Sequence, residues 1–425
     1  MTLSPEIMTS VEQLGYRVTV GDVATQAGLE LNVVQQGLLA LASDSGGHLQ
    51  VAESGEIIYL FPQNFKTILR NKYWKLRFKE TWKKIWNALF YLIRISFGVI
   101  LIASVVFVMI TIAIIVVVIR SDSGKDRDYQ ESRGLGYRDN FIFFPSFSDL
   151  FWIFYPDHNY DLYLDKSYQS SERNRQESNL SFLEAIFSFL FGEGNPNNDL
   201  EKYRWQEIGS VIRNNQGAII AQQVLPYLDK ITQYDEDNED YMLPILTRFN
   251  GYPKVSSQGE IIYCFPELQV TAQLHKKRSV TSYLKEKSYL FSRASSRQIM
   301  LATGLGVLNF ILVLVLGYLI KDPKVVNQMT GLVFFASSIY WILLVYAIAF
   351  LGTPLVRYFW IRWRNNKIES RNMIRQKRAE DLLQPSKTLQ RKIKYACEFA
   401  AEKLITKTDI SYTTEKDLWE QEVEH

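Results

Sequence analysis

Three long runs of apolar residues stand out from the rest of the chain. They occupy 95–119, 299–320 and 329–356, and none of them contains a charged residue. A bilayer core about 30 Å thick is crossed by roughly 20 helical residues. Basic and aromatic residues of the kind found at membrane boundaries flank the runs. The pattern predicts an integral membrane protein with about three transmembrane helices.

A second pattern is an octapeptide that occurs twice. GEIIYLFP at 55–62 and GEIIYCFP at 259–266 end two stretches of sixteen residues, which match at nine positions without a gap. Each stretch predicts a β-hairpin: a short strand, a turn with glycine, and a strand rich in β-branched and aromatic residues that ends at proline. We interpret the pair as a diverged internal repeat.

The hairpin residues for which we expect a structural role are the turn glycine, three alternating apolar residues and the final proline. They are Gly55, Ile57, Tyr59, Phe61 and Pro62 in the first copy, and Gly259, Ile261, Tyr263, Phe265 and Pro266 in the second. Because alternate residues of a strand point to the same face, each apolar set should share one buried face.

Helical and short extended segments precede each hairpin. The first copy predicts helices over 4–15, 21–28 and 30–46, with a short strand over 16–20. The second predicts helices over 199–217, 222–229 and 235–251, with a strand over 218–221. Helix, strand, helix, helix and hairpin is the winged-helix order, and 21–41 resembles the helix-turn-helix part of that superfamily.

The predicted fold class is therefore an α+β membrane protein with two winged-helix-like modules. We expect the modules at 1–65 and 199–268, a basic amphipathic helix at 66–94, transmembrane helices at 95–119, 299–320 and 329–356, a linker with interfacial apolar segments at 120–198, a basic connector at 269–298, and a basic, then acidic, helical tail at 357–425.

The charge of the modules argues against binding to duplex DNA. Residues 1–65 hold one basic and seven acidic residues, and 199–266 hold six basic and ten acidic residues. A duplex binder neutralises phosphates with Lys and Arg. We therefore expect no nucleic acid partner and favour protein partners.

Positive charge is concentrated beside the apolar runs instead. Eight basic residues and one acidic residue occur in each of 66–84 and 357–378. These stretches are typical of membrane boundaries, where the charged groups of Arg and Lys reach the lipid phosphates and aromatic rings lie among the headgroups. Such clusters also attract anionic lipid. The predicted membrane-interface residues are Lys83, Lys84, Arg94, Arg357, Trp360, Arg362, Trp363 and Arg364.

Two further apolar segments are shorter than the three runs, and the one at 181–192 is too short to cross a membrane as a helix. At 181–192, Phe182, Ile186, Phe189 and Leu190 fall on one side, which favours an interfacial or re-entrant helix. The segment 141–156 is apolar and aromatic. In the tail, Leu389, Ile393, Ala396, Ala400 and Leu404 form one helical stripe, which we expect to pack on another part of the protein.

The sequence lacks the residue patterns that are typical of catalytic or metal-binding sites. Two cysteines and four histidines show no metal-ligand spacing. Phosphate-binding and nucleophile-elbow motifs are missing, and the apolar runs hold no ionisable residue that would indicate an ion pathway. We predict no enzymatic activity, no catalytic, cofactor-binding or metal-binding residue, and no cofactor.

The combination of motifs resembles a family of uncharacterised membrane proteins shared by cyanobacteria and plant plastids. The resemblance rests on LALASDSGGHLQVAESGEIIYLFP, the long first run, FLEAIFSFLFGEGNPN, and GEIIYCFP before the last two runs. It implies an inner or thylakoid membrane. Some plant members carry an iron–sulfur biosynthesis label, but a cluster usually needs four thiolates, and this chain has two cysteines.

The function that this pattern favours is a non-enzymatic membrane scaffold or assembly factor, with membrane lipid and unidentified proteins as partners. The alternatives are a membrane-tethered transcription regulator and a small transporter or channel subunit. The basic clusters place the N-terminus and both modules in the cytoplasm. Three crossings would separate the modules, so a shared side requires either that 85–119 forms a hairpin or that 141–156 returns through the bilayer. The alternative is a plain three-span topology, which places the modules on opposite sides.

Overall fold

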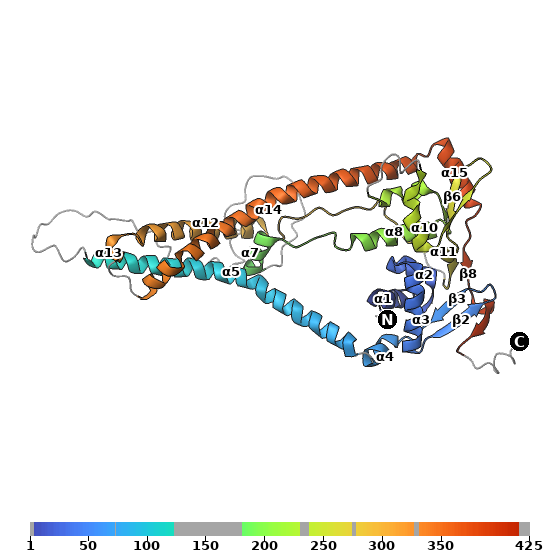
Figure 1. Cartoon of the computed structure of the whole chain (residues 1–425), viewed down its shortest axis with the longest axis horizontal. Coiled ribbons are helices and arrows are strands. Elements are labelled where there is room, and N and C mark those ends of the chain that lie inside the picture. Colours follow the sequence, from blue (N-terminus) through green and yellow to red (C-terminus); the bar gives the residue numbers. More distant parts are fainter. Residues whose placement is uncertain are drawn as a thin grey trace, which may run out of the picture. The chain divides into compact units, whose positions relative to one another are not determined.

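The computed structural model describes residues 4–72, 74–122, 181–229, 238–273, 278–326 and 331–415 (Figure 1). They form two compact units. The sheet unit comprises Met1–Trp82, Pro196–Ser288 and Asn365–His425, and the helical unit comprises Lys83–Asn195 and Tyr289–Arg364. Each unit is therefore assembled from parts of the chain that are far apart in sequence.

The first segment of the sheet unit has a three-stranded sheet covered by three helices. Its elements are α1 (Pro5–Gln13), β1 (Arg17–Thr19), α2 (Val20–Ala27), α3 (Leu31–Ser45), β2 (His48–Ala52) and β3 (Ile57–Leu60). Strand β3 lies between β1 and β2 and is antiparallel to both. Gly55 adopts a φ of 88° in the turn of the hairpin, a conformation that favours glycine.

The second segment has the same strand arrangement. Its elements are α8 (Leu200–Asn214), β4 (Ala218–Ile219), η1 (Ala221–Tyr227), η2 (Asp240–Met242), α10 (Leu243–Phe249), β5 (Tyr252–Val255), β6 (Ile261–Cys264), α11 (Pro266–Gln269) and β7 (Val270–Thr271). Strand β6 lies between β4 and β5, with Gly259 at φ 81° in the turn. The predicted helix at 222–229 is the 3-10 helix η1, which contains Pro226. Proline disrupts the backbone hydrogen bonds of an α-helix.

The two segments share one hydrophobic core. Val23, Leu38 and Tyr59 from the first segment and Ile208, Phe249 and Phe265 from the second belong to the same cluster of buried residues. The close approach depends partly on Gly21 of α2, because a Cβ there would lie 2.1 Å from the carbonyl oxygen of Glu267. The segments predicted at 1–65 and 199–268 are thus packed together as parts of one unit.

The C-terminal tail completes the sheet unit. It forms α15 (Lys387–Cys397), β8 (Lys403–Leu404), η3 (Lys407–Asp409) and β9 (Ile410–Thr413). Strand β8 pairs with β7, and β9 pairs with β2, which extends the first sheet to the order β1-β3-β2-β9. The predicted stripe of the tail does pack on another element, because Leu389, Ile393, Ala396 and Ala400 contact the second sheet at Ile262 and its neighbours. Leu404 lies beyond the helix, in β8.

The predicted alternation of buried and exposed residues in the first hairpin is wrong at Ile57, because the C-terminal tail covers the opposite face of β3. Ile57 is 37% exposed, whereas its neighbour Ile58 is fully buried. Ile58 packs with Ala272 and Ile405, residues that the local pattern of the strand could not reveal. Both faces of β3 are therefore partly buried, and Tyr59 and Phe61 lie in the shared core as expected.

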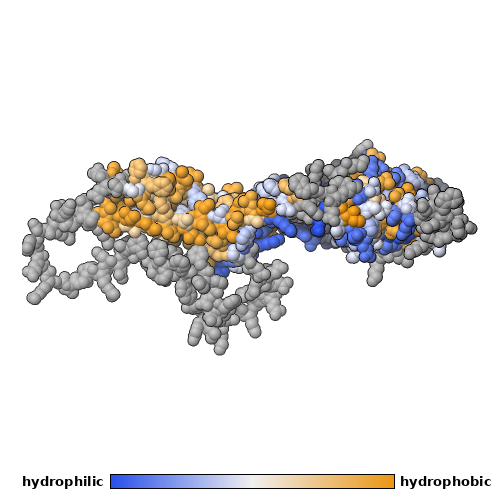
Figure 2. All heavy atoms as spheres, turned by 90° about the horizontal axis from the view of Figure 1, so that it is seen from below, coloured by the Kyte–Doolittle hydropathy of each residue, from blue (hydrophilic) through white to orange (hydrophobic). Residues whose placement is uncertain are grey.

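The helical unit contains the helices that are long and apolar enough to cross a membrane. Such candidate spans lie within Lys84–Ile119, Ser296–Leu319 and Gly331–Leu383 of the described residues. On the face of the molecule seen in Figure 2, apolar side chains gather over the region of these helices. Large side chains such as Leu92, Val117 and Trp341 are exposed there, as expected where lipid is the solvent.

The helices extend across several of the predicted boundaries. After α4 (Phe65–Lys72), helix α5 (Trp74–Asp122) joins the predicted basic helix to the first span, and α14 (Gly331–Leu383) continues the third span far into the predicted tail. Lysine and arginine are good helix formers, so a change from apolar to basic residues does not end a helix. Because α5 is continuous, the predicted hairpin within 85–119 is wrong.

Two shorter helices complete the helical unit beside α12 (Ser296–Leu319). They are α7 (Phe182–Phe191) and α13 (Pro323–Val326). Ile186, Phe189 and Leu190 of α7 pack against Leu101 and Phe350 of the long helices. The predicted apolar side of α7 is therefore a protein contact. The predicted segment 141–156 and most of the predicted linker lie outside the described residues.

Replacing Phe61 by alanine should destabilise the sheet unit by about 3–5 kcal/mol, the usual cost of removing a buried phenyl ring. The Phe61 ring is buried, with its centroid 5.9 Å from that of Phe65. Thermal unfolding of the full chain in detergent measures the loss. Ile57→Ala is the control, because Ile57 is exposed and its truncation should change the midpoint little. Equal midpoints for both variants and the native chain would contradict the packing.

Candidate functional site

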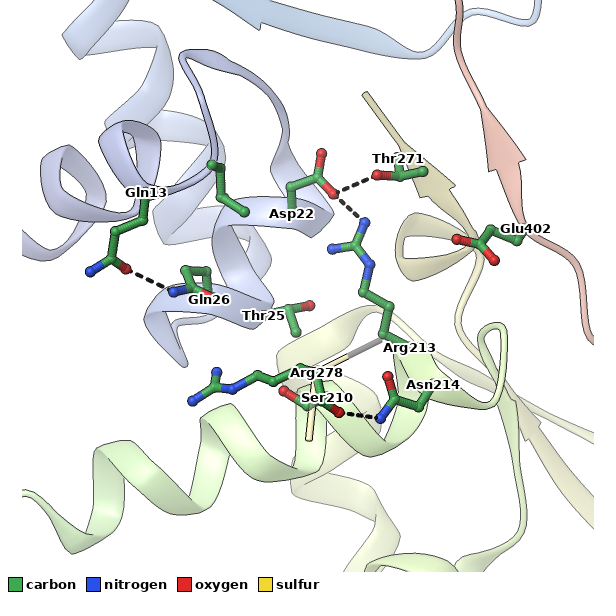
Figure 3. Close-up of a pocket in the computed structure, with 11 residues that line it drawn as sticks. Gln13, Asp22, Thr25, Gln26, Ser210, Arg213, Asn214, Thr271, Arg278 and Glu402 are labelled. Atoms are coloured by element: carbon green, nitrogen blue, oxygen red, sulfur yellow. Dashed lines mark hydrogen bonds and ion pairs between the residues drawn. The ribbon is translucent and has the colours of Figure 1, made fainter. Parts of the chain in front are cut away.

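The junction of the two segments is organised around the buried carboxylate of Asp22 (Figure 3). Arg213 Nη2 and Thr271 Oγ1 donate hydrogen bonds to Asp22 Oδ1, the latter at 3.1 Å. The backbone N–H groups of Thr19 and Ala272 donate to Oδ2 at 3.0 and 3.2 Å. The carboxylate thus joins α2 to α8 and to the strand β7, and its charge is balanced by Arg213.

Local chemistry explains why Asp22 is placed there. Thr19 precedes α2 and its hydroxyl accepts a hydrogen bond from the Asp22 N–H at 3.1 Å, while Asp22 accepts from the Thr19 N–H. This reciprocal capping box begins the helix. The other three hydrogen bonds of the carboxylate come from Arg213, Thr271 and the Ala272 N–H. One side chain therefore serves both the start of the helix and the junction.

Arg17 makes a second link at the same junction. Its guanidinium donates to the carbonyl oxygens of Ala272 and, at 2.9 Å, Ile405. Its Nε also donates to Gln50 Oε1 at 3.3 Å. Burial lowers the pKa of Arg17, and the charge of Asp22 opposes that shift. Arg17, the one basic residue of 1–65, is therefore engaged inside the protein.

A cavity of about 450 Å³ opens beside this junction. Its lining residues are Gln13, Leu14, Asp22, Thr25, Gln26, Ser210, Arg213, Asn214, Thr271, Arg278 and Glu402. The volume is in the range of small-molecule pockets, but those are mostly apolar, whereas this lining is mostly polar. Asp22 and Arg213, on the wall of the cavity, are paired with each other and join the two segments.

Another buried carboxylate fastens the tail to the second segment. Glu239 accepts hydrogen bonds from Tyr263 Oη at 2.8 Å, Lys392 Nζ at 3.1 Å and Gln222 Nε2 at 3.2 Å. Burial, followed by the hydrogen bond to Glu239, raises the pKa of Tyr263. Tyr263, predicted as a structural residue of the hairpin, therefore also holds α15 through this carboxylate.

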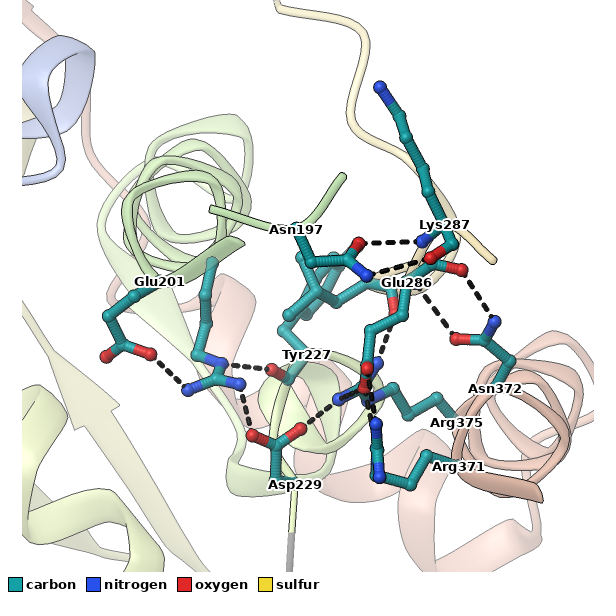
Figure 4. Close-up of polar contacts among 11 residues, drawn as sticks. Asn197, Glu201, Tyr227, Asp229, Glu286, Lys287, Arg371, Asn372 and Arg375 are labelled. Carbon is teal, nitrogen blue, oxygen red and sulfur yellow. Dashed lines mark hydrogen bonds and ion pairs between the residues drawn. The ribbon is translucent and has the colours of Figure 1, made fainter. Parts of the chain in front are cut away.

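In the sheet unit, a buried arginine of α14 attaches this helix to the residues around it (Figure 4). Arg375 is 1% exposed and donates to the Leu284 carbonyl at 2.8 Å, to Glu286 Oε1 at 2.9 Å and to Asp229. Arg371 Nε donates to Glu286 Oε1 at 2.7 Å. Burial raises the pKa of Glu286, but Arg371 and Arg375 outweigh it, so that pKa lies below its usual value.

The connector after the second segment is fixed by the same group of contacts. Asn372 and the backbone of Glu286 exchange two hydrogen bonds of 2.9 Å, and Asn197 and the backbone of Lys287 exchange two of 2.8 Å. Glu286 and Lys287 of the predicted connector at 269–298 are thus held by side chains. Neither this network nor Asp22 was predicted, because each depends on residues distant in sequence.

The predicted membrane-interface residues divide into two groups. Lys84, Arg362 and Trp363 are exposed, as are Trp360 and Arg364, whereas the side chain of Lys83 lies outside the described parts. Arg94 and Arg357 instead bind protein groups at the end of α7. Arg94 Nη2 lies 2.9 Å from both carboxylate oxygens of Glu193, and Arg357 Nη1 donates to the Phe189 carbonyl at 2.7 Å.

These two arginines stabilise the C-terminus of a short helix. The last carbonyl groups of a helix lack intrahelical partners, and cations there also interact favourably with the helix dipole. Arg357 further lies over the ring of Phe291, 4.6 Å from its centroid. We conclude that the position of α7 in the helical unit depends on Arg94 and Arg357.

The exposed face of α3 is notable for its lack of positive charge. Val33 and Leu39 are 49% and 44% exposed, and α3 contains no Lys or Arg. Asn32, Gln35 and Gln36 are exposed on the same helix. This face can offer apolar contacts and amide hydrogen bonds to a partner, but it offers no cation for a phosphate.

Cys264 is buried and Cys397 is exposed. Burial raises the pKa of the Cys264 thiol, and the charge of Lys254 opposes that shift. Among the residues that the structure describes, no three His, Cys, Asp or Glu side chains gather as metal ligands.

Comparison with known proteins places the chain in a family. It is 36% identical to the uncharacterized chloroplastic protein At5g03900 of Arabidopsis thaliana over 432 residues, which cover 98% of this chain and 80% of the relative. The chain belongs to the family of this plastid protein. No family model and no solved structure matches it. A chloroplastic relative and three candidate spans are compatible with a plastid-type membrane protein.

Replacing Asp22 by asparagine should lower the stability of the sheet unit by about 3 kcal/mol or more. The change leaves Arg213 without its buried counter-charge, which is the costly way to break such a pair. Thermal unfolding of the full chain in detergent is the measurement. Glu53→Gln, the same chemical change at an exposed carboxylate, should have little effect. A midpoint for Asp22→Asn equal to that of Glu53→Gln would refute the role of the junction.

Proposed function

We propose that this protein is a non-enzymatic membrane scaffold or assembly factor. It recruits protein partners through two winged-helix-like segments that share one core. The observation that carries the proposal is the exposed face of α3, which has no Lys or Arg and on which Val33 and Leu39 stand out.

The element order supports a winged-helix interpretation of the segments. In the first, a helix, a short strand, two helices and a hairpin follow one another, and the second hairpin strand pairs with the short strand. The second segment repeats this order and pairing, with the 3-10 helix η1 at the position of α2. Together with the octapeptide, this favours duplication of one ancestral segment.

The surface chemistry favours protein over DNA as the partner. In a winged-helix protein that binds DNA, basic residues near the second helix of the helix-turn-helix would meet phosphates. Helix α3 occupies that position here and has no basic residue. In the second segment, Leu243 at the start of α10 is also exposed. Exposed apolar residues with few charged neighbours are typical of the core of a protein interface.

We further propose that both segments lie on the same side of the membrane, the cytoplasmic side. Residues that share a core cannot be divided by a bilayer, and the two segments share one. An even number of crossings must therefore separate them, and α5 accounts for one. The segment that the sequence offers for the return, 141–156, lies outside the described residues.

Substituting aspartate for both Val33 and Leu39 should abolish recruitment, because charge on an apolar contact surface disfavours its burial. The full chain is cross-linked in native membranes and purified, and the co-purifying proteins are quantified by mass spectrometry. We expect the double variant to lose the main partner at least about tenfold, which corresponds to roughly 1.4 kcal/mol of binding.

Leu383→Asp is the control, because Leu383 is an apolar residue elsewhere in the sheet unit that is even more exposed, at 80%. It should retain the partner, and all variants should unfold at the native temperature. Unchanged recovery with Val33→Asp and Leu39→Asp combined would overturn the assignment of α3. Micromolar binding of the native chain to random duplex DNA at physiological salt would favour the transcription regulator instead.

A further inference from the structure

Arg364 occupies an unusual setting in the helical unit. Its guanidinium carbon lies 5.2 Å from the ring centroid of Tyr289 and 5.2 Å from that of Trp360. The two rings are themselves in edge-to-face contact, with centroids 5.6 Å apart and planes at 76°. The cation is thus held against two aromatic groups, an arrangement that attracts a guanidinium electrostatically.

The aromatic partners of Arg364 are themselves fixed. Tyr289 Oη donates a hydrogen bond to Asn195 Oδ1 at 2.7 Å. Trp360 precedes Arg364 by one helical turn of α14, so the indole and the guanidinium lie on the same side of that helix. A preorganised guanidinium loses less conformational freedom when it binds a ligand.

In the part of the chain that the structure describes, nothing occupies the hydrogen-bonding edge of Arg364. A guanidinium has five N–H donors, and within the described residues no carboxylate or carbonyl accepts from those of Arg364. Arg94 and Arg357, in the same unit, use theirs on Glu193 and on the carbonyls of α7. Arg364 is exposed, so a ligand can reach its donors.

The position of this group along α14 indicates the kind of ligand. Arg364 follows Val356, the last residue of the apolar run, by eight residues, which is about 12 Å of helix. Phe359 and Trp363 in the same turns are exposed aromatic residues. Tryptophan and arginine at such a distance from a hydrocarbon core meet the headgroups of lipids.

We propose that Arg364, Trp360 and Tyr289 form a binding site for the phosphate of an anionic phospholipid. The planar guanidinium presents two parallel N–H groups that match phosphate oxygens, a pairing that is strong because both groups are charged. The aromatic faces hold the guanidinium in place, and the neighbouring apolar helix surface accommodates the acyl chains. The proposal is independent of the protein partner of α3.

The test is lipid selectivity in nanodiscs. The full chain is reconstituted in phosphatidylcholine with a trace of spin-labelled phosphatidylglycerol or spin-labelled phosphatidylcholine. The motionally restricted fraction of each label, measured by electron paramagnetic resonance, gives the selectivity ratio. We expect the native chain to prefer phosphatidylglycerol, and Arg364→Gln to reduce that preference about fivefold, the effect of one charge near an anionic surface.

Two matched variants separate a built site from general positive charge. Arg362→Gln removes the same charge from an exposed position two residues away, and it should leave most of the preference intact. Arg364→Lys keeps the charge but lacks the planar fork, so it should restore the preference only in part. Equal losses for Arg362→Gln and Arg364→Gln, or full restoration by lysine, would overturn the proposal.

A competition experiment distinguishes a lipid from a soluble phosphate. Glycerol phosphate at millimolar concentration should not displace restricted phosphatidylglycerol, because it lacks acyl chains to contact the helices. Displacement by glycerol phosphate would show that the site takes a soluble anion, and it would contradict the assignment to lipid. Circular dichroism of each variant confirms that the helices are intact.

Discussion

The sheet unit depends on the buried carboxylate of Asp22. Its four hydrogen bonds come from Thr19, Ala272, Thr271 and Arg213, so one group connects the start of α2, the helix α8 and the strand β7. A buried charge is costly unless it is paired and fully hydrogen-bonded. The carboxylate therefore specifies one relative arrangement of the two segments, and the hydrophobic core between them supplies the larger part of the stabilisation.

That arrangement constrains the rest of the chain. A shared core requires both segments to lie on one side of any membrane that the long helices cross. The tail then reaches both sheets, with α15 on the second and β9 at the edge of the first. An exposed sheet edge invites pairing with other chains, and β9 occupies that edge of β2. The face of α3 remains exposed and available for a partner.

Features that depend on neighbouring residues could be predicted from the sequence. The hairpins, the turn glycine Gly55 and the apolar spans follow from local pattern and length. The partners of arginine could not be predicted, because Arg213 meets Asp22 across 191 positions and Arg357 caps a helix that lies far from it in sequence. The burial of Ile58 likewise depends on Ile405 in the tail. Periodicity reports which residues are apolar, but not which distant element covers them.

We propose that the two segments form one unit on one side of the membrane, and the accessibility of their hairpin turns tests this most directly. Ser54 and Ser257 lie exposed in the turns of the two hairpins, and each is replaced by cysteine in a full chain that lacks Cys264 and Cys397. Sealed vesicles are treated with a membrane-impermeant maleimide, before and after opening with detergent. If the two segments share a core, both sites are labelled from the same face. Labelling of the two sites from opposite faces would contradict the shared core.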